Sequence, residues 1–175
     1  MIENLTKSEM KTLMYFISNP ESEVHIRGLA GEIESSYSTV RDSLEKLREK
    51  GYLEYREEGN LKKYAPSREK FRKIKQVINI KQIKESGLVE YLEKELRPET
   101  IVLFGSYLEG RDKQGSDIDL AVIGGRSKEL DLSDFEEELG REIQLTRVRD
   151  LKDESSEFKN TLANGLVLQG YLEVV

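Results

Sequence analysis

Apolar residues recur at helical spacing in the first part of the chain. They predict three helices, over residues 5–19, 24–33 and 35–51. Thr6 and Glu9 stand three residues apart at the start of the first helix, as in a capping box. After the third helix the pattern changes to alternation on both sides of Gly59-Asn60, which is typical of a β-hairpin. Three helices followed by a hairpin therefore make up a first domain, residues 1–68.

The next segment, residues 69–97, is expected to be a helical connector that is interrupted at Ser86-Gly87. Apolar residues form one stripe before the break and a second stripe after it: Phe71, Ile74, Val77, Ile78 and Ile83, then Leu88, Leu92 and Leu96. A connector that packs on its neighbours would show this pattern, and so would a dimerisation helix.

The last segment, residues 98–175, alternates between strand-like and helix-like patterns. Strands are expected at 100–106, 117–124 and 142–148, and a last strand or an extended tail at 166–174. Helices are expected at 130–140 and 155–165. Strands that alternate with helices predict an α/β domain with a mixed sheet, so that the whole chain belongs to the α+β class.

Composition narrows the chemistry that this chain can carry out. It has no cysteine and one histidine in 175 residues, so a bound metal ion must be held mainly by oxygen ligands. No apolar run is long enough to cross a membrane and the first residues are polar, so we expect a cytoplasmic protein without a membrane partner. Residues 1–72 carry 13 basic and 13 acidic side chains, whereas residues 99–175 carry 9 and 17. The acidic last part suits cations better than duplex DNA.

The first domain resembles a winged helix-turn-helix over roughly residues 5–66, through the stretch "GLAGEIESSYSTVRDSLEKLREKGYLEYREEGNLKKYAPS". The resemblance implies that the third helix enters the major groove of double-stranded DNA and that the hairpin is the wing. The implied DNA-contacting side chains are Ser36, Tyr37, Ser38, Thr39 and Arg41 on the helix, with Arg56, Lys62 and Lys63 on the wing. Winged helices also serve as protein-binding modules, and Glu54, Glu57 and Glu58 in the wing leave that alternative open.

Two aspartates in the last segment predict a cation site. Alternation along "SDIDLAV" places Asp117 and Asp119 on one face of a strand, about 6 to 7 Å apart. Two such carboxylates are costly to bury together unless a cation such as Mg²⁺ joins them. Gly105 and Ser106 follow the preceding strand, where they would let a phosphate approach the backbone and offer it a hydroxyl. This combination predicts a site for a metal and a nucleoside triphosphate.

The stretch "GSYLEGRDKQGSDIDL" resembles the minimal nucleotidyltransferases of the polymerase-β-like superfamily, over about residues 98–170. The resemblance implies that Gly105 and Ser106 bind phosphate and that Asp117 and Asp119 bind metal. It also implies a third carboxylate on a later strand, at the position where Gln144 stands. Glu142, two residues earlier, is the candidate to replace it as a catalytic residue.

Another departure from the family concerns Glu109, which stands where small members of the family often carry arginine. Arg111 and Lys113 are the candidates to replace that cation.

Three functions follow from these patterns. We expect a DNA-binding transcriptional regulator with a fused nucleotidyltransferase-like domain that binds metal and nucleotide. The alternative is an active Mg²⁺-dependent nucleotidyltransferase that modifies a protein or a small molecule, and Gln144 leaves catalysis open. The third is an antitoxin that acts beside a toxin-like protein partner. A regulator that reads a palindromic operator would be a homodimer, with the connector helices as its interface.

Overall fold

The computed structural model describes residues 5–173. The chain divides into two compact units, Met1–Lys75 and Gln76–Val175, and the boundary falls inside helix α4 (Glu69–Glu85). The boundaries predicted from the sequence, at residues 68 and 97, lie on either side of this one, so the predicted connector is shared between the two units. Of the expected final strand or tail, residue 174 lies outside the described part of the chain. Among residues 5–173, no helix has the length and apolar character needed to cross a membrane.

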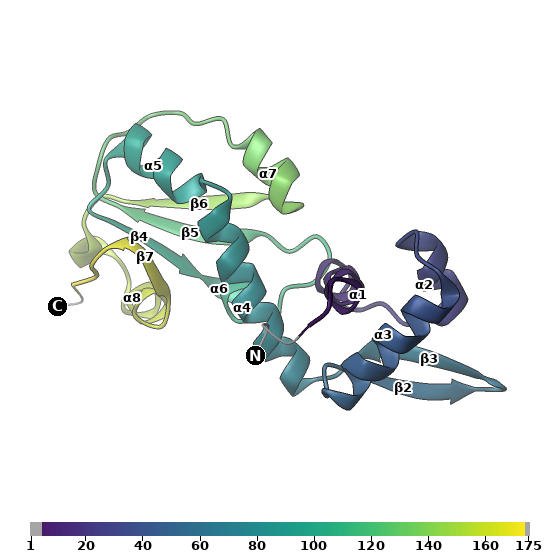
Figure 1. Cartoon of the computed structure of the whole chain (residues 1–175). Helices are drawn as coiled ribbons and strands as arrows, with labels where there is room; N and C mark the ends of the chain where they lie inside the picture. The colour runs from purple at the N-terminus through teal and green to yellow at the C-terminus, as the bar shows by residue number, and fades with distance from the viewer. Residues whose placement is uncertain (1–4, 174–175) are drawn as a thin grey trace. The chain divides into compact units, whose positions relative to one another are not determined.

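From residue 5 onward, the N-terminal unit contains three complete helices, the first part of α4 and a three-stranded antiparallel sheet (Figure 1). Its sheet has the order β1-β3-β2, and β2 and β3 form the expected hairpin. The elements are α1 (Lys7–Ser18), β1 (Val24–His25), α2 (Ile26–Glu32), α3 (Tyr37–Glu49), β2 (Leu53–Glu58) and β3 (Leu61–Pro66). The two-residue strand β1 was not expected, because its residues were assigned to the second helix.

Local interactions fix the ends of these helices. The predicted capping box is present in α1: the Glu9 backbone N–H donates to Thr6 Oγ1, and the Thr6 N–H donates to Glu9 Oε2, both at 3.3 Å. In α3 the Ser36 hydroxyl accepts a hydrogen bond from the Thr39 N–H at 3.2 Å. The turn between α2 and α3 includes Glu34 at a φ of +46°, in the left-handed region that L-residues seldom adopt.

The apolar stripes of these helices meet the sheet in one core. Its fully buried side chains come from the three complete helices of the unit and from β3: Leu13, Phe16, Leu29, Val40, Leu44, Leu47 and Tyr64. The unit therefore has a hydrophobic core of its own.

The C-terminal unit is built on a mixed four-stranded sheet of order β6-β5-β4-β7 (Figure 1). Strand β4 pairs antiparallel with β5 and β7, whereas β5 and β6 are parallel and α7 connects them. Its strands are β4 (Thr100–Phe104), β5 (Ile118–Ile123), β6 (Ile143–Val148) and β7 (Leu166–Gly170). The expected α+β class with a mixed sheet is therefore confirmed.

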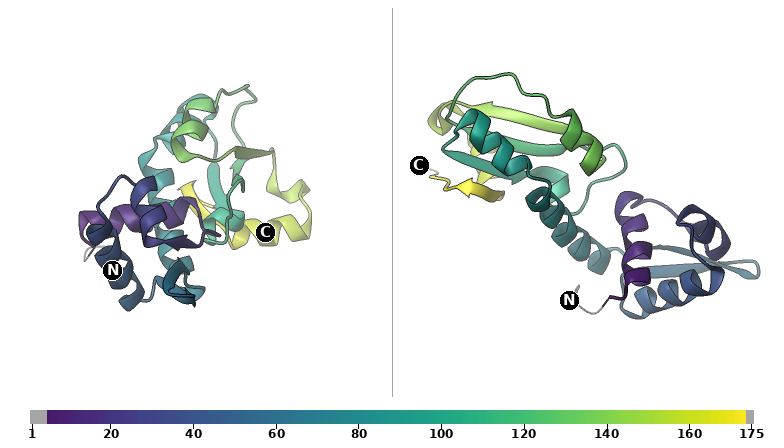
Figure 2. Two further views of the ribbon diagram at one scale, coloured as in Figure 1. Left: turned by 90° about the vertical axis from the view of Figure 1, so that its right-hand side faces the viewer. Right: turned by 45° about the horizontal axis from the view of Figure 1, so that its top comes forward.

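Helices cover both faces of this sheet, as two views show (Figures 1 and 2). Side chains of α5 and α7 share one buried cluster with Ile118, Leu120 and Val122 of β5. Side chains of α8 share a second cluster with Ala121 and Ile123, on the other face. The helices of this unit, besides α4, are α5 (Leu88–Leu96), α6 (Gly105–Leu108), α7 (Ser133–Leu139) and α8 (Ser156–Ala163), with a short 3-10 turn at Leu151–Asp153.

The break between α4 and α5 lies where the sequence predicted it, with Gly87 at a φ of +76°. Leu88, Leu92 and Leu96 are fully buried, so α5 is part of the core of the C-terminal unit. Val77 is 48% exposed, contrary to its place in the predicted apolar stripe of α4. Val77 directly precedes Ile78 in the helix, and of these two residues only Ile78 lies on the buried face.

Candidate functional site

A tight turn at the end of β4 holds the backbone against an aspartate of β5. Gly105 has a φ of +76°, and a Cβ atom added there would lie 2.1 Å from Asp119 Oδ2. No side chain fits at this position without moving the carboxylate. Gly105 is also the first residue of the single-turn helix α6, and Ser106 is the second. The sequence predicts Gly105 and Ser106 beside the aspartates, and in the structure Gly105 lies directly against Asp119.

Strand register places four polar residues at the starts of the neighbouring strands β5 and β6, beside the end of β4. Asp119 pairs with Phe104 of β4 and with Gln144 of β6. The Ile118 N–H donates to the Glu142 carbonyl at 2.8 Å, so Glu142 lies level with Asp117, each just before its strand. Because β5 and β6 run parallel, Gln144 is the residue of β6 beside Asp119, and Glu142 is one strand repeat away from it.

Two aromatic side chains pack on one face of the sheet at this end. The rings of Phe104 and Phe158 of α8 meet edge to face, with centroids 5.9 Å apart. Both rings pack against the apolar cluster that includes Ala121, on the face of β5 that Asp119 shares by alternation. Neither phenylalanine is among the site residues predicted from the sequence. The position of Phe104 directly before Gly105, at the end of an apolar strand, was the available signal for one of them.

The electrostatics of the two aspartates favour a cation. Burial raises the pKa of Asp119, and the negative charge of Asp117 raises this pKa further. Within residues 5–173, neither carboxylate has a hydrogen-bond or salt-bridge partner. A divalent cation would offset both effects, and carboxylate oxygens are the ligands that Mg²⁺ prefers. The two aspartates therefore fit such an ion.

The structure does not assemble a larger cluster of metal ligands. Among the described residues, no group of three or more histidine, aspartate or glutamate side chains is close enough to hold an ion. Glu142 is exposed and does not join the two aspartates in such a group. Gln144, also exposed, occupies the neighbouring position and has a neutral amide. The remaining coordination positions of Mg²⁺ at Asp117 and Asp119 would thus belong to water or to phosphate oxygens.

Cations near the turn are held by neighbouring acids or lie in the adjoining loop. Arg111 forms an ion pair with Glu109, and its backbone N–H donates to the Ser106 carbonyl at 2.9 Å. The Lys113 N–H donates to Ser116 Oγ at 2.9 Å. Arg111 thus stays beside Ser106, with Glu109 as its counter-ion.

On the N-terminal unit, the first turn of α3 is exposed but internally bonded. Tyr37 is 49% exposed. The hydroxyl of Ser36, in addition to capping the helix, lies 3.0 Å from Ser38 Oγ and 2.8 Å from Thr39 Oγ1. Arg41 is paired with Asp42 at 2.8 Å. Ser36 therefore has a structural role at the helix start, whereas Tyr37 and Arg41 point outward.

The wing cations are paired with acids as well. Arg56 lies 2.6 Å from Glu23, and Lys63 lies 3.4 Å from the same carboxylate. Lys62 lies 2.8 Å from Glu45 of α3. A pocket of about 810 Å³ opens between α2, α3 and the hairpin, and its lining includes Tyr37, Arg41, Glu45, Leu61 and Lys62. The structure thus brings Tyr37, Arg41 and Lys62 together, while Arg56 and Lys63 lie outside that lining.

The C-terminal unit, with its mixed sheet and its glycine turn beside two aspartates, is similar to nucleotidyltransferase domains. Residues 86–171 match the family described as polymerase beta, nucleotidyltransferase. Comparison with curated proteins gave no match.

Two solved structures resemble parts of the chain. A possible transcriptional regulator from Methanosarcina mazei Go1 is 24% identical, with a TM-score of 0.39 over 53% of this chain and 80% of that one. A fragment (1–100) of a possible transcriptional regulatory protein from Mycobacterium bovis is 17% identical, with a TM-score of 0.38 over 43% of this chain and 77% of that one.

Proposed function

We propose that this protein is a DNA-binding transcriptional regulator whose nucleotidyltransferase-like domain binds a metal–nucleotide complex. One observation carries the proposal: Asp119 lies against the Gly105 turn and has Gln144, not a third carboxylate, beside it on β6. The proposal assigns metal and phosphate binding to Asp117, Asp119 and the Gly105 turn, and the position beside Asp119 on β6 has no base. This arrangement favours binding over turnover.

Each residue of the site has a definite task in this proposal. Asp117 and Asp119 hold Mg²⁺, which neutralises their charge together with that of the phosphates. Gly105 leaves the space that a Cβ would fill, and the Ser106 hydroxyl donates to a phosphate oxygen. The amide of Gln144 can hydrogen-bond to a nucleotide but cannot accept a proton from an attacking hydroxyl.

The proposal for the N-terminal unit is that it is a winged helix-turn-helix that reads DNA through α3 and the β2–β3 hairpin. Support comes from the element order and from the exposed Tyr37 and Arg41 at the start of α3. The ion pair of Arg41 with Asp42 does not prevent this, because both side chains are exposed and such a pair stabilises a protein only slightly. A DNA phosphate can replace Asp42 as the partner of Arg41.

The DNA proposal is tested by fluorescence anisotropy with labelled fragments of the protein's own promoter region at several salt concentrations. We expect affinity to fall steeply with salt, and Arg41→Ala to weaken binding roughly five- to tenfold and to lower the salt slope by about one. Arg149→Ala, an exposed arginine of the C-terminal unit, is the matched control and should change neither. Affinity that does not depend on salt would indicate a protein-binding module instead.

A second candidate function, nucleotide transfer, is favoured by Glu142. Its backbone lies level with Asp117, so its side chain shares the face of the two aspartates. Incubation with nucleotides labelled at the α-phosphate, in the presence of cell extract, measures transfer directly. If the wild type labels an acceptor and Glu142→Gln does not, the protein is an enzyme. We expect no transfer by the wild type and gain of transfer by Gln144→Asp, which places a third carboxylate beside Asp119.

A further inference from the structure

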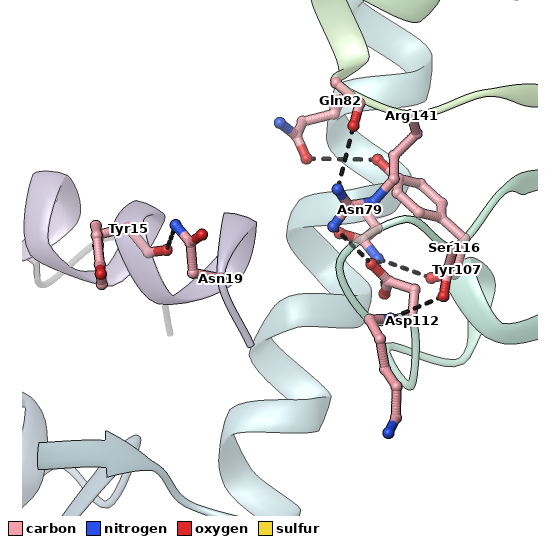
Figure 3. A network of polar contacts seen from close by, with 10 residues as sticks. Tyr15, Asn19, Asn79, Gln82, Tyr107, Asp112, Ser116 and Arg141 are labelled. Carbon is pink, nitrogen blue, oxygen red and sulfur yellow. Dashed lines mark hydrogen bonds and ion pairs between the residues drawn. The ribbon is translucent and has the colours of Figure 1, made fainter. Parts of the chain in front are cut away.

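A buried polar network joins three segments of the C-terminal unit (Figure 3). Asn79 of α4 donates from Nδ2 to Asp112 Oδ1 at 2.9 Å and to the Tyr107 carbonyl at 2.8 Å. Arg141 approaches the other carboxylate oxygen of Asp112, at 3.4 Å. The three side chains come from helix α4, from the loop between α6 and β5, and from the turn before β6.

The network is an unusual choice for stability alone. Asn79 is 1% exposed and Asp112 is 2% exposed. Within the described residues, the buried Nε of Arg141 has no hydrogen-bond partner. Burying an ion pair with one donor unsatisfied is unfavourable compared with apolar packing of the same volume. Hydrophobic side chains at these positions would thus hold the fold at least as well, which points to a different reason for the pair.

The bonds of the network reach segments of the chain that carry site residues. The Tyr107 carbonyl follows Ser106 in α6, and Asp112 lies in the loop that leads to Asp117. Arg141 directly precedes Glu142, whose carbonyl accepts the Ile118 N–H. The segment that carries Ser106 is therefore tied directly to Asn79 of α4, and Asp112 ties the loop before Asp117 to both Asn79 and Arg141.

We propose that Asp112 and Arg141, anchored by Asn79, are positioning residues that hold the α6–β5 loop against the start of β6. The inference rests on the proposed function, because the held groups are those of the metal–nucleotide site. In the network's absence Asp117 and the Ser106 turn would sample several relative positions. This mobility would lower the affinity for the metal–nucleotide complex, even at a temperature where the protein is fully folded.

Amide hydrogen exchange without ligand tests the positioning itself. The Ser116 and Ile118 amides report on the loop, because they donate to the Lys113 and Glu142 carbonyls. In Arg141→Met we expect these amides to exchange at least fivefold faster, while the amides of β4 keep their protection. Arg141→Lys should restore most of the protection because it keeps the charge.

Matched variants separate this role from general stability. Arg147→Met removes an arginine from β6 whose partners are the carbonyls of Arg126 and Lys128, and it should leave the loop amides unchanged. Asp112→Asn, which is isosteric, is the second network variant should Arg141→Met fold poorly. Unchanged loop exchange in both network variants, or equal loss of protection over the whole unit, would overturn the proposal.

Calorimetric titration of Mg²⁺–nucleoside triphosphates then links the loop to the site. We expect Arg141→Met to weaken binding about tenfold and Arg141→Lys to weaken it less. Faster loop exchange with unchanged affinity would refute the positioning role. If the loop exchanges faster in the variant but the wild type binds no nucleotide, the proposed function is refuted. The role of the network in holding the α6–β5 loop would then remain as a feature of the fold.

Discussion

Gly105 shows how one residue type decides whether the site can exist. Its backbone adopts a left-handed φ of +76°, and its Cα faces the carboxylate of Asp119. Any side chain would both strain the backbone and displace that carboxylate. Both effects disturb the site, because the turn at Gly105 contacts the Asp119 carboxylate and also leads directly into Ser106.

Gly105→Ala is therefore expected to destroy nucleotide binding without unfolding the chain. The left-handed conformation costs alanine about 1 to 2 kcal/mol, which a domain of this size tolerates. The carboxylate must move away from the added methyl group, so we expect Mg²⁺-dependent affinity to fall by more than tenfold. Gly115→Ala, at a φ of +80° in open space, carries the same backbone strain and should keep its affinity. Equal losses in both variants would show that strain alone is responsible.

Single residues of the site differ in how far the sequence reveals them. Asp117, Asp119 and Gly105 follow from alternation and from the residues around the strand end, because these signals are local. Asn79, Asp112 and Arg141 do not, since their contacts join residues that are about 30 positions apart in the sequence. Asp112 lies in a polar loop, and its sequence context gives no signal that its side chain will be buried.

Helix α3 and the hairpin are joined through one carboxylate. Glu45 accepts hydrogen bonds from Lys62 Nζ at 2.8 Å and from the Tyr64 hydroxyl at 2.5 Å, and it also pairs with Arg48. The pKa of Glu45 is lowered to about 2, first by the hydrogen bond from Lys62, then by the hydrogen bond from Tyr64, and also by the hydrogen bond from Arg48. This glutamate therefore links the two elements that we propose face DNA.

The depressed pKa of Glu45 predicts a pH-dependent contribution to stability. The carboxylate stabilises the fold above its ordinary pKa of 4.5, and this stabilisation is lost as the pH falls towards a value of about 2. We expect Glu45→Gln to lower the free energy of unfolding at pH 7 by on the order of 1 to 2 kcal/mol, after allowance for solvent screening. The difference from the wild type should shrink as the pH approaches 2.

Urea unfolding of the full chain, followed through NMR signals of the N-terminal unit, provides this measurement. Glu49→Gln, on the exposed side of the same helix, is the control and should change stability little. A Glu45→Gln effect of equal size at pH 7 and pH 3 would show that lost packing, not lost charge, is the cause.

Long periodic elements were predictable, and short ones were not. The helices of the N-terminal unit, the hairpin and the main strands of the mixed sheet follow from apolar periodicity. Strand β1 has two residues and exists through its pairing with β3, while α6 is a single turn formed around Gly105. Neither is long enough to show a period of its own, so tertiary contacts decide both.

The chain as a whole combines two units that each have their own hydrophobic core. Acidic residues outnumber basic ones by 17 to 9 in residues 99–175, whereas they are balanced in residues 1–72. The first unit therefore lacks the general repulsion that the last part would impose on duplex DNA, and the last part suits bound cations. This division of charge agrees with one unit for DNA and one for metal and nucleotide.

The most direct test of metal–nucleotide binding is calorimetric titration of the full chain with ATP, GTP, CTP and UTP, with and without Mg²⁺. We predict that at least one nucleotide binds, that binding requires Mg²⁺, and that the double variant Asp117→Asn with Asp119→Asn abolishes it. Absence of binding for all four nucleotides, or binding that persists in the double variant, would contradict the proposed site.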